Sequence, residues 1–297
     1  MDSRTAQRAS SDAMAAVAAY GVAGIWLSTI YSPGFGLQSA GQALGPLAGG
    51  IIADQWSLRG VFWVSLLLGL VVLGMSARLP ETRSRHTQVR SRLLEFGRLR
   101  DLAPQFRVTY LVLIYATFAA GLRNSVVSAI LPLHAEGTFG YSTTQLGAQF
   151  AVIGLVTLIV MAPAGWISDK IGRKAATIPA ALFSGIAFLA YPFARPLPAL
   201  FAVSIAIGIS GGFALGAMTV YTYDIAPVQA RARLQALRRT MNEVGGVVGP
   251  AVAGAIVTVS STGLSFLALA PFHFLAVALL AVGARETAGK HRAASNL

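Results

Sequence analysis

Residues 165–174 read Gly165-Trp166-Ile167-Ser168-Asp169-Lys170-Ile171-Gly172-Arg173-Lys174, a charged turn between two long apolar stretches. Neither residues 151–164 before this turn nor residues 175–194 after it contain a charged side chain. A bilayer core of about 30 Å requires about 20 apolar residues per helix. The pattern therefore predicts a hairpin of two membrane-spanning helices, with its basic turn on the cytoplasmic side, where lysine and arginine are enriched.

The composition also indicates an integral membrane protein. Hydrophobic residues make up 55% of the chain and charged residues only 11%, whereas soluble domains contain about 25% charged residues. The net charge of +12 is spread over connectors between apolar stretches and does not form one basic surface, so no nucleic-acid partner is expected. The sequence contains no cysteine, which excludes disulfides and thiolate metal sites, and no metal or cofactor is expected.

The apolar stretches predict an all-α membrane protein with about nine transmembrane helices. We expect spans near residues 34–54, 61–77, 108–133, 144–164, 175–194, 197–222, 240–260 and 264–283, and a further one within 9–30. The expected organisation is a partial N-terminal bundle (1–77), a basic cytoplasmic linker (78–107), a complete six-helix C-terminal bundle (108–283) and a cytoplasmic tail (284–297).

The distribution of positive charge predicts the orientation of these spans. The four connectors on one side, residues 78–107, 165–174, 223–239 and 284–297, contain 18 of the 23 lysines and arginines. Because positive residues accumulate on the cytoplasmic side, these connectors and the C-terminus are expected to be cytoplasmic, in the cell (inner or plasma) membrane. Asp224 is expected to be a charge in one of these connectors.

The charged turn resembles the signature loop of the major facilitator superfamily of secondary transporters, G-x-x-x-D-[RK]-x-G-[RK]-[RK]. The matching residues are Gly165, Asp169, Lys170, Gly172, Arg173 and Lys174. We expect Gly165 to allow close approach of a neighbouring helix. We expect the Asp169 carboxylate to accept hydrogen bonds at the start of the 34–54 helix, which would give the loop a role in gating. The alternative is that these charges only set topology.

A second stretch, Gly41-Gln42-Ala43-Leu44-Gly45-Pro46-Leu47-Ala48-Gly49-Gly50, resembles the G-x-x-x-G-P-x-x-G-G motif in the fifth helix of antiporters of that superfamily. Pro46 is expected to kink its helix. The glycines Gly41, Gly45, Gly49 and Gly50 are expected to give a flat face for packing, and a plain packing seam is the alternative. A fainter echo, residues 245–254, suggests that the two halves are internal repeats.

A third resemblance concerns the N-terminus. Residues 4–7, with Arg4 and Gln7, resemble part of the R-x-x-Q-G motif of the fourth helix in the same superfamily. With this alignment, residues 1–77 correspond to the fourth to sixth helices, and the chain is expected to lack the first three.

Polar side chains inside the spans are the candidates for transport and coupling, because charges in the membrane are costly. Arg123, followed by Asn124, is expected to hold an anionic substrate group or a coupling carboxylate, or else to be a structural arginine at a packed interface. Glu243, preceded by Asn242, is a candidate for proton coupling. An ion pair of Glu243 with Arg238 or Arg239 is the competing interpretation.

The sequence contains no recognisable catalytic motif and no phosphate-cradling loop, so neither an enzyme nor an ATP-driven pump is expected. The resemblance implies proton-coupled efflux or antiport of a small molecule by alternating access, with the lipid bilayer, a small-molecule substrate and protons as partners. The alternatives are a truncated, non-transporting fragment and, less favoured, an uptake permease for a metabolite or sugar.

Overall fold

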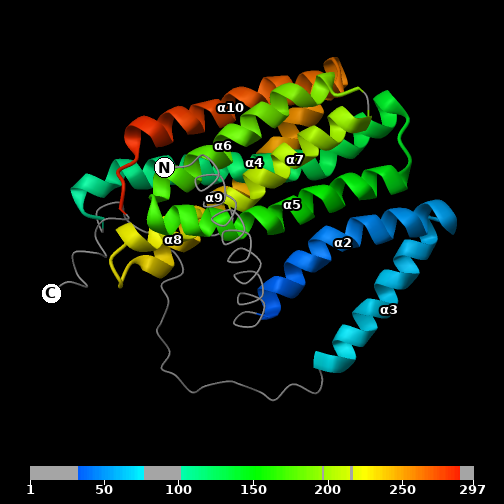
Figure 1. The fold of residues 1–297 in the computed structure, drawn as a ribbon, viewed down its shortest axis with the longest axis horizontal. Helices are drawn as coiled ribbons and strands as arrows, with labels where there is room; N and C mark the ends of the chain where they lie inside the picture. The colour runs from blue at the N-terminus through cyan, green and yellow to red at the C-terminus, as the bar shows by residue number, and fades with distance from the viewer. Residues whose placement is uncertain (1–32, 77–101, 196, 215–216, 288–297) are drawn as a thin grey trace, which may run out of the picture.

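The computed structural model describes residues 33–76, 102–195, 197–214 and 217–287, which are helical apart from short turns (Figure 1). The helices are α2 (Pro33–Gln55), α3 (Leu58–Ser76), α4 (Pro104–Phe139), α5 (Thr143–Lys170), α6 (Arg173–Ala190), η2 (Tyr191–Phe193), α7 (Leu197–Ala214), α8 (Ala217–Ile225), α9 (Arg231–Val259) and α10 (Thr262–Gly283). The span expected within 9–30 and the motif with Arg4 and Gln7 lie outside the described residues.

The helices confirm the expected all-α membrane fold. Seven segments of the described chain are long and apolar enough to cross a membrane, if α7 and α8 are taken as one. The helix α2 is not among them, because its glycines and polar side chains lower its hydropathy. No residue of the α3 window Arg59–Ser76 is buried, and its exposed Phe62, Trp63 and Leu66 are suited to contact with lipid.

Several helices continue beyond the apolar stretches that predicted the spans. The helix α4 has 36 residues, a length of roughly 54 Å at 1.5 Å per residue, and its first turn, residues 104–107, falls in the expected linker. The helix α5 runs through the signature loop to Lys170, so only Ile171 and Gly172 separate it from α6. Residues 231–239, expected in a connector, form the start of α9.

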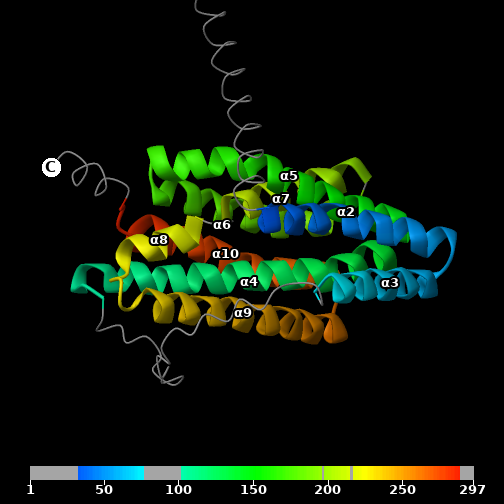
Figure 2. The same cartoon turned by 90° about the horizontal axis from the view of Figure 1, so that it is seen from below.

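The helices α4 to α10 form one bundle whose packing order differs from the chain order. The helix α4 packs on α9 and α10, α10 on α6, α6 on α7, and α7 on α5 (Figures 1 and 2). The helix α2 packs on α5, and α3 packs on α2 at the edge of the bundle. In Figure 2, α4 lies between α5 and α9.

Four glycines bring two pairs of helices close together, α4 with α9 and α2 with α5. On α4 and α9, a Cβ atom on Gly121 would clash with the Asn242 carbonyl, and one on Gly245 would clash with the Phe118 carbonyl. On α2 and α5, a Cβ atom on Gly50 would clash with the Thr143 carbonyl, and one on Gly147 with the Pro46 carbonyl. Small residues allow such backbone approach between membrane helices. Each helix with a Gly-Pro motif, α2 and α9, is thus docked by its glycines on a partner helix.

Candidate functional site

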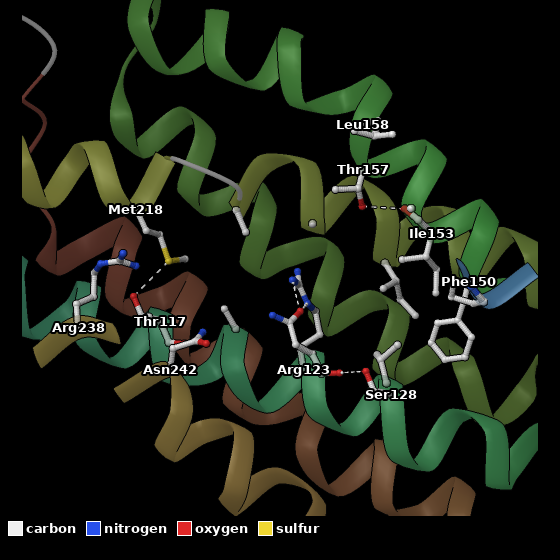
Figure 3. A pocket seen from close by; sticks show the side chains of 18 residues that line it. Thr117, Arg123, Ser128, Phe150, Ile153, Thr157, Leu158, Met218, Arg238 and Asn242 are labelled. Carbon is white, nitrogen blue, oxygen red and sulfur yellow. Dashed lines mark hydrogen bonds between the residues drawn. The ribbon is translucent and has the colours of Figure 1, made fainter. Parts of the chain in front are cut away.

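A cavity of about 710 Å³ is surrounded mainly by helices of the bundle of α4 to α10 (Figure 3). Its walls come from five helices of the bundle, α4, α5, α7, α8 and α9, and from Pro46 of α2. The volume is within the range of about 300–1,000 Å³ that is typical of small-molecule sites. Three of the four residues proposed for transport or coupling, Arg123, Asn124 and Asn242, line this cavity.

Arg123 is the central polar group of the cavity. Its side chain extends from the middle of α4, and the residue is only 6% exposed. Nη1 donates to the hydroxyls of Ser184, at 3.5 Å, and Ser210. Nε and Nη2 both donate to Oδ1 of Asn124, at 3.2 and 2.7 Å. All these partners are neutral, and no carboxylate in the described part of the chain forms an ion pair with this guanidinium.

The contacts of Arg123 also join three helices of the bundle. Ser184 lies on α6 and Ser210 on α7, and Ser210 in turn donates to the Ala180 carbonyl at 2.7 Å. The Ser184 and Ser210 hydroxyls lie 2.6 Å apart. The Nη1 group therefore has a structural role at a packed helix interface, as in the alternative interpretation of Arg123. The Nε–Nη2 edge instead donates to Asn124, which is exposed.

A second polar group lies at the side of the cavity formed by α9. Arg238 donates from Nε to Gln235 and from Nη2 to Thr219, both at 2.9 Å. Asn242, one turn further along α9, donates to the Thr117 carbonyl at 3.3 Å. Figure 3 shows Arg238, Asn242 and Thr117 together on one side of Arg123. Arg238 is therefore a second cation of the cavity, and the acceptors of its hydrogen bonds, Gln235 and Thr219, are also neutral.

Glu243 does not line the cavity. It is exposed on α9, next to the cavity-lining Asn242. The guanidinium of Arg238 contacts Gln235 and Thr219, and the ion pairs of the described residues do not join Glu243 to Arg238 or Arg239, the expected alternative. A role of Glu243 in coupling stays a prediction.

The signature loop is tied to its own bundle through Arg173. Its Nε atom donates to Asp224 at 2.7 Å, and Nη1 donates to Asp169 at 2.5 Å and Ser168 at 2.9 Å. The side chains of Arg173 and Asp224 are 10% and 11% exposed, whereas that of Asp169 is 70% exposed. Asp224 at the end of α8, expected to be a simple connector charge, is therefore the buried partner of the loop.

The carboxylate of Glu286, just after α10, caps the start of α6. It accepts hydrogen bonds from the backbone N–H groups of Arg173, at 2.7 Å, and Lys174, at 3.0 Å. Because N–H groups of the first helical turn lack partners within the helix, a carboxylate there is favourable. Gly172 has φ of 151°, and a Cβ atom on it would meet the Glu286 carboxylate. Glycine is therefore favoured at this position.

The other loop residues make weaker contacts. Lys174 donates from Nζ to the Ala281 carbonyl of α10 at 2.7 Å, and Lys170 is exposed. Gly165 is exposed, and no described atom lies within 4 Å of a Cβ atom placed on it. No described helix packs closely on Gly165, and its expected role in helix packing stays a prediction. The expected contact of Asp169 with the start of α2 stays a prediction, because side chains there lie outside the described part.

The antiporter-like motif contributes one close contact and one cavity residue. Gly50 is packed against α5, and Pro46 lines the cavity. A Cβ atom on Gly41, Gly45 or Gly49 would meet no described atom within 4 Å. The expected flat packing face of four glycines is therefore reduced to Gly50, since the α2–α5 crossing point lies at this end of the motif.

Asp54, which the sequence did not single out, joins α2 to α5 at the opposite end from the signature loop. Its carboxylate accepts from the Thr143 hydroxyl and from the Thr144 backbone N–H, the latter at 2.8 Å. Ser142 caps the same helix start by accepting from the Gln145 N–H at 3.3 Å. A carboxylate of α2 thus accepts hydrogen bonds from the N-terminal residues of α5.

Sequence reasoning missed Ser184, Ser210, Asp224, Glu286 and Asp54. The serines are common in membrane helices, and the three carboxylates lie at helix ends, where a solvated charge is the ordinary expectation. Their partners are far away along the chain: 61 residues separate Arg123 from Ser184, and 113 separate Arg173 from Glu286. A proline or glycine motif can be recognised from neighbouring residues in the sequence. These hydrogen-bonded pairs, in contrast, form only when the helices pack.

Comparison with known proteins gives a consistent family. The family model described as "Major Facilitator Superfamily" matches residues 113–296. The chain is 26% identical over 222 residues to multidrug resistance protein MdtG of Citrobacter koseri, covering 73% of this chain and 54% of that protein. It is 27% identical over 184 residues to multidrug resistance protein 1 of Bacillus subtilis, covering 60% and 46%. The chain thus spans about half the length of the curated relatives it matches.

Proposed function

Because the chain belongs to the Major Facilitator Superfamily, we propose that it is a secondary transporter that exports a small molecule in exchange for protons by alternating access. The observation that carries this proposal is the cavity of about 710 Å³ with Arg123 at its centre. It is lined by five helices of the bundle and by Pro46 of α2, and transporter sites lie at interfaces between repeats.

The relation of α2 to α5 supports alternating access. The two helices touch where Gly50 meets Thr143 and Asp54 holds the start of α5, and they diverge toward their other ends (Figure 1). This arrangement fits a state that is closed at the end with Asp54 and open at the end with the signature loop. Rocking of α2 against the bundle would exchange the two openings.

The names of the relatives and the antiporter-like motif support export. The relatives from Citrobacter koseri and Bacillus subtilis are both named multidrug resistance proteins. Proton exchange is the energy source we propose, with Glu243 as the candidate proton carrier, because it lies beside the cavity residue Asn242 on α9. The signature loop, with Asp169 and Arg173, is proposed to act in gating at the cytoplasmic side. The C-terminus is proposed to lie on the same side of the membrane.

The test uses inverted membrane vesicles that contain the full chain and have an imposed acidic interior. The probes are 2-naphthalenesulfonate, 2-naphthalenesulfonamide and trimethyl-(2-naphthyl)ammonium, which share one ring system and differ in charge. We expect uptake of at least one probe that stops when a protonophore collapses the gradient. Arg123→Ala should abolish this uptake, while Arg59→Gln, which removes an exposed charge on α3, should leave it unchanged.

Two results would contradict the proposal in different ways. Uptake that persists without a proton gradient would exclude proton exchange but leave transport in place. A chain that binds a probe and moves none of them would exclude transport and favour the non-transporting alternative.

A further inference from the structure

We propose that the cavity selects organic anions, with the acidic group of the ligand held by the guanidinium of Arg123 and an apolar body packed against α5 and α7. This inference rests on the proposed function only in so far as the bound molecule is the one transported. Binding itself is tested separately below.

The charges around the cavity are the first argument. Arg123 and Arg238 line it, and no aspartate or glutamate is among the lining residues in the described part of the chain. Both guanidinium groups have neutral hydrogen-bond partners. Arg123 is buried and Arg238 is half-buried, and a buried cation with no carboxylate partner among the described residues is unfavourable in a membrane protein. A ligand with negative charge removes this cost, whereas a cationic ligand increases it.

The geometry of Arg123 is the second argument. A guanidinium offers two parallel N–H groups on its Nε–Nη2 edge, which match the two oxygens of a carboxylate or related oxyanion. In the structure both groups of this edge share the single Oδ1 atom of Asn124, and Asn124 is exposed. The other side, Nη1, is fixed by Ser184 and Ser210. The guanidinium is therefore fixed at Nη1, whereas its Nε and Nη2 groups share one neutral acceptor atom on Asn124.

This arrangement identifies Asn124 as an exchangeable partner. An oxyanion that enters the cavity would replace the neutral amide oxygen with two charged oxygens, and Asn124 would turn away or donate its own N–H₂ to the ligand. The fixed Nη1 side means that little further ordering of Arg123 is needed, which favours binding. Arg238, on the side of the cavity with Asn242 and Thr117, adds a second positive charge.

The apolar wall defines the rest of the ligand. On the other side of Arg123 from Arg238, Figure 3 shows Phe150, Ile153 and Leu158 of α5. Ile207 of α7 adds to the same lining. An aromatic or aliphatic body gains free energy by contact with these side chains in proportion to the apolar area that it buries. The layout therefore fits an amphiphilic anion better than a small inorganic ion.

The binding experiment uses the full chain in nanodiscs of zwitterionic phosphatidylcholine, so that no anionic lipid competes. The three naphthyl probes are titrated by equilibrium dialysis. We expect 2-naphthalenesulfonate to bind about tenfold to a hundredfold more tightly than the neutral sulfonamide, the factor expected for hydrogen bonds to a charged group. The quaternary ammonium probe should bind more weakly than the sulfonamide.

Variants test whether Arg123 is responsible. Arg123→Gln should reduce sulfonate affinity about tenfold to a hundredfold and leave sulfonamide affinity within about twofold. Arg123→Lys, which keeps the charge and loses the paired N–H edge, should keep part of the preference. Arg59→Gln removes an equal charge from an exposed site of α3 and should change neither affinity, which controls for net charge.

Three results would overturn the inference. The first is equal affinity for the sulfonate and the sulfonamide. The second is a sulfonate preference that Arg123→Gln leaves intact. The third is competition by methanesulfonate as strong as that by 2-naphthalenesulfonate, which would exclude the apolar body. A further arm with nanodiscs that contain phosphatidylglycerol shows whether a lipid phosphate takes the site: loss of sulfonate binding there would assign it to lipid and overturn the choice of a soluble anion.

These outcomes are distinct from those of the vesicle assay. Sulfonate binding without any uptake would refute transport and leave the anion site in place. Gradient-driven uptake of the ammonium probe alone would support transport and refute the anion site.

Discussion

Replacement of Arg173 tests whether the signature loop is held by a buried ion pair. Its Nε atom lies 2.7 Å from Asp224 Oδ2, and the two side chains are 10% and 11% exposed. Removal of one partner of a buried pair leaves an uncompensated charge and costs about 3–5 kcal/mol. Arg173→Ala should therefore lower the free energy of unfolding by about 3 kcal/mol, the lower end of that range, because the site lies at the membrane surface.

The same structure predicts a small effect at Asp169, although Asp169 is a defining residue of the motif. Its carboxylate lies 2.5 Å from Arg173 but is 70% exposed, and exposed ion pairs contribute about 0–1 kcal/mol. Asp169→Asn should therefore cost less than about 1 kcal/mol. Asp224→Ala should be clearly more destabilising than Asp169→Asn, which reverses the order that the motif alone suggests.

The assay is equilibrium unfolding in mixed micelles with increasing dodecyl sulfate, followed by tryptophan fluorescence. A double-mutant cycle of Arg173→Ala and Asp224→Ala isolates the pair, and we expect a coupling energy of about 2–3 kcal/mol. The cap by Glu286 uses the backbone of residue 173, so it remains in every variant. A coupling energy below about 0.5 kcal/mol, or an equal cost for Asp169→Asn and Asp224→Ala, would refute the reasoning.

Three further predictions follow from glycine contacts and from Asp54. Gly172→Ala should cost about 1–3 kcal/mol in unfolding free energy, because φ is 151° and a Cβ atom meets a carboxylate, whereas Gly165→Ala in an open helical position should be neutral or stabilising. Gly245→Val should destabilise the chain, measured in the same unfolding assay, because the added atoms meet the α4 backbone. Asp54→Asn should raise the rate at which an impermeant maleimide labels Ser128→Cys from the outer side, because the hold on α5 is weakened.

The controls use the same types of substitution at open sites. A Cβ atom on Gly254 of α9 meets no described atom within 4 Å, so equal destabilisation by Gly245→Val and Gly254→Val would contradict the close contact with α4. Because the chain has no native cysteine, the labelling signal comes from residue 128 alone. An unchanged labelling rate in Asp54→Asn would exclude Asp54 as a lock between α2 and α5.

The sequence by itself determined the class of this protein, because a membrane imposes strong local constraints. Every spanning segment must be apolar for about 20 residues, and basic residues collect on one side. Both signals are contiguous along the chain, so the helices and the family resemblance were predictable. The ends of α4, α5 and α9 were not, since a helix may continue past the apolar stretch into water, where hydropathy gives no signal.

Only the tertiary structure decided which polar groups meet. Arg123 was a candidate from its position in a span, but its neutral partners Ser184 and Ser210 come from α6 and α7. Asp224 became a buried partner of Arg173 because α8 packs beside the hairpin, while Glu243 is exposed and does not line the cavity. Hydropathy places a residue along a helix, whereas the direction in which its side chain faces depends on the packing of helices far apart in sequence.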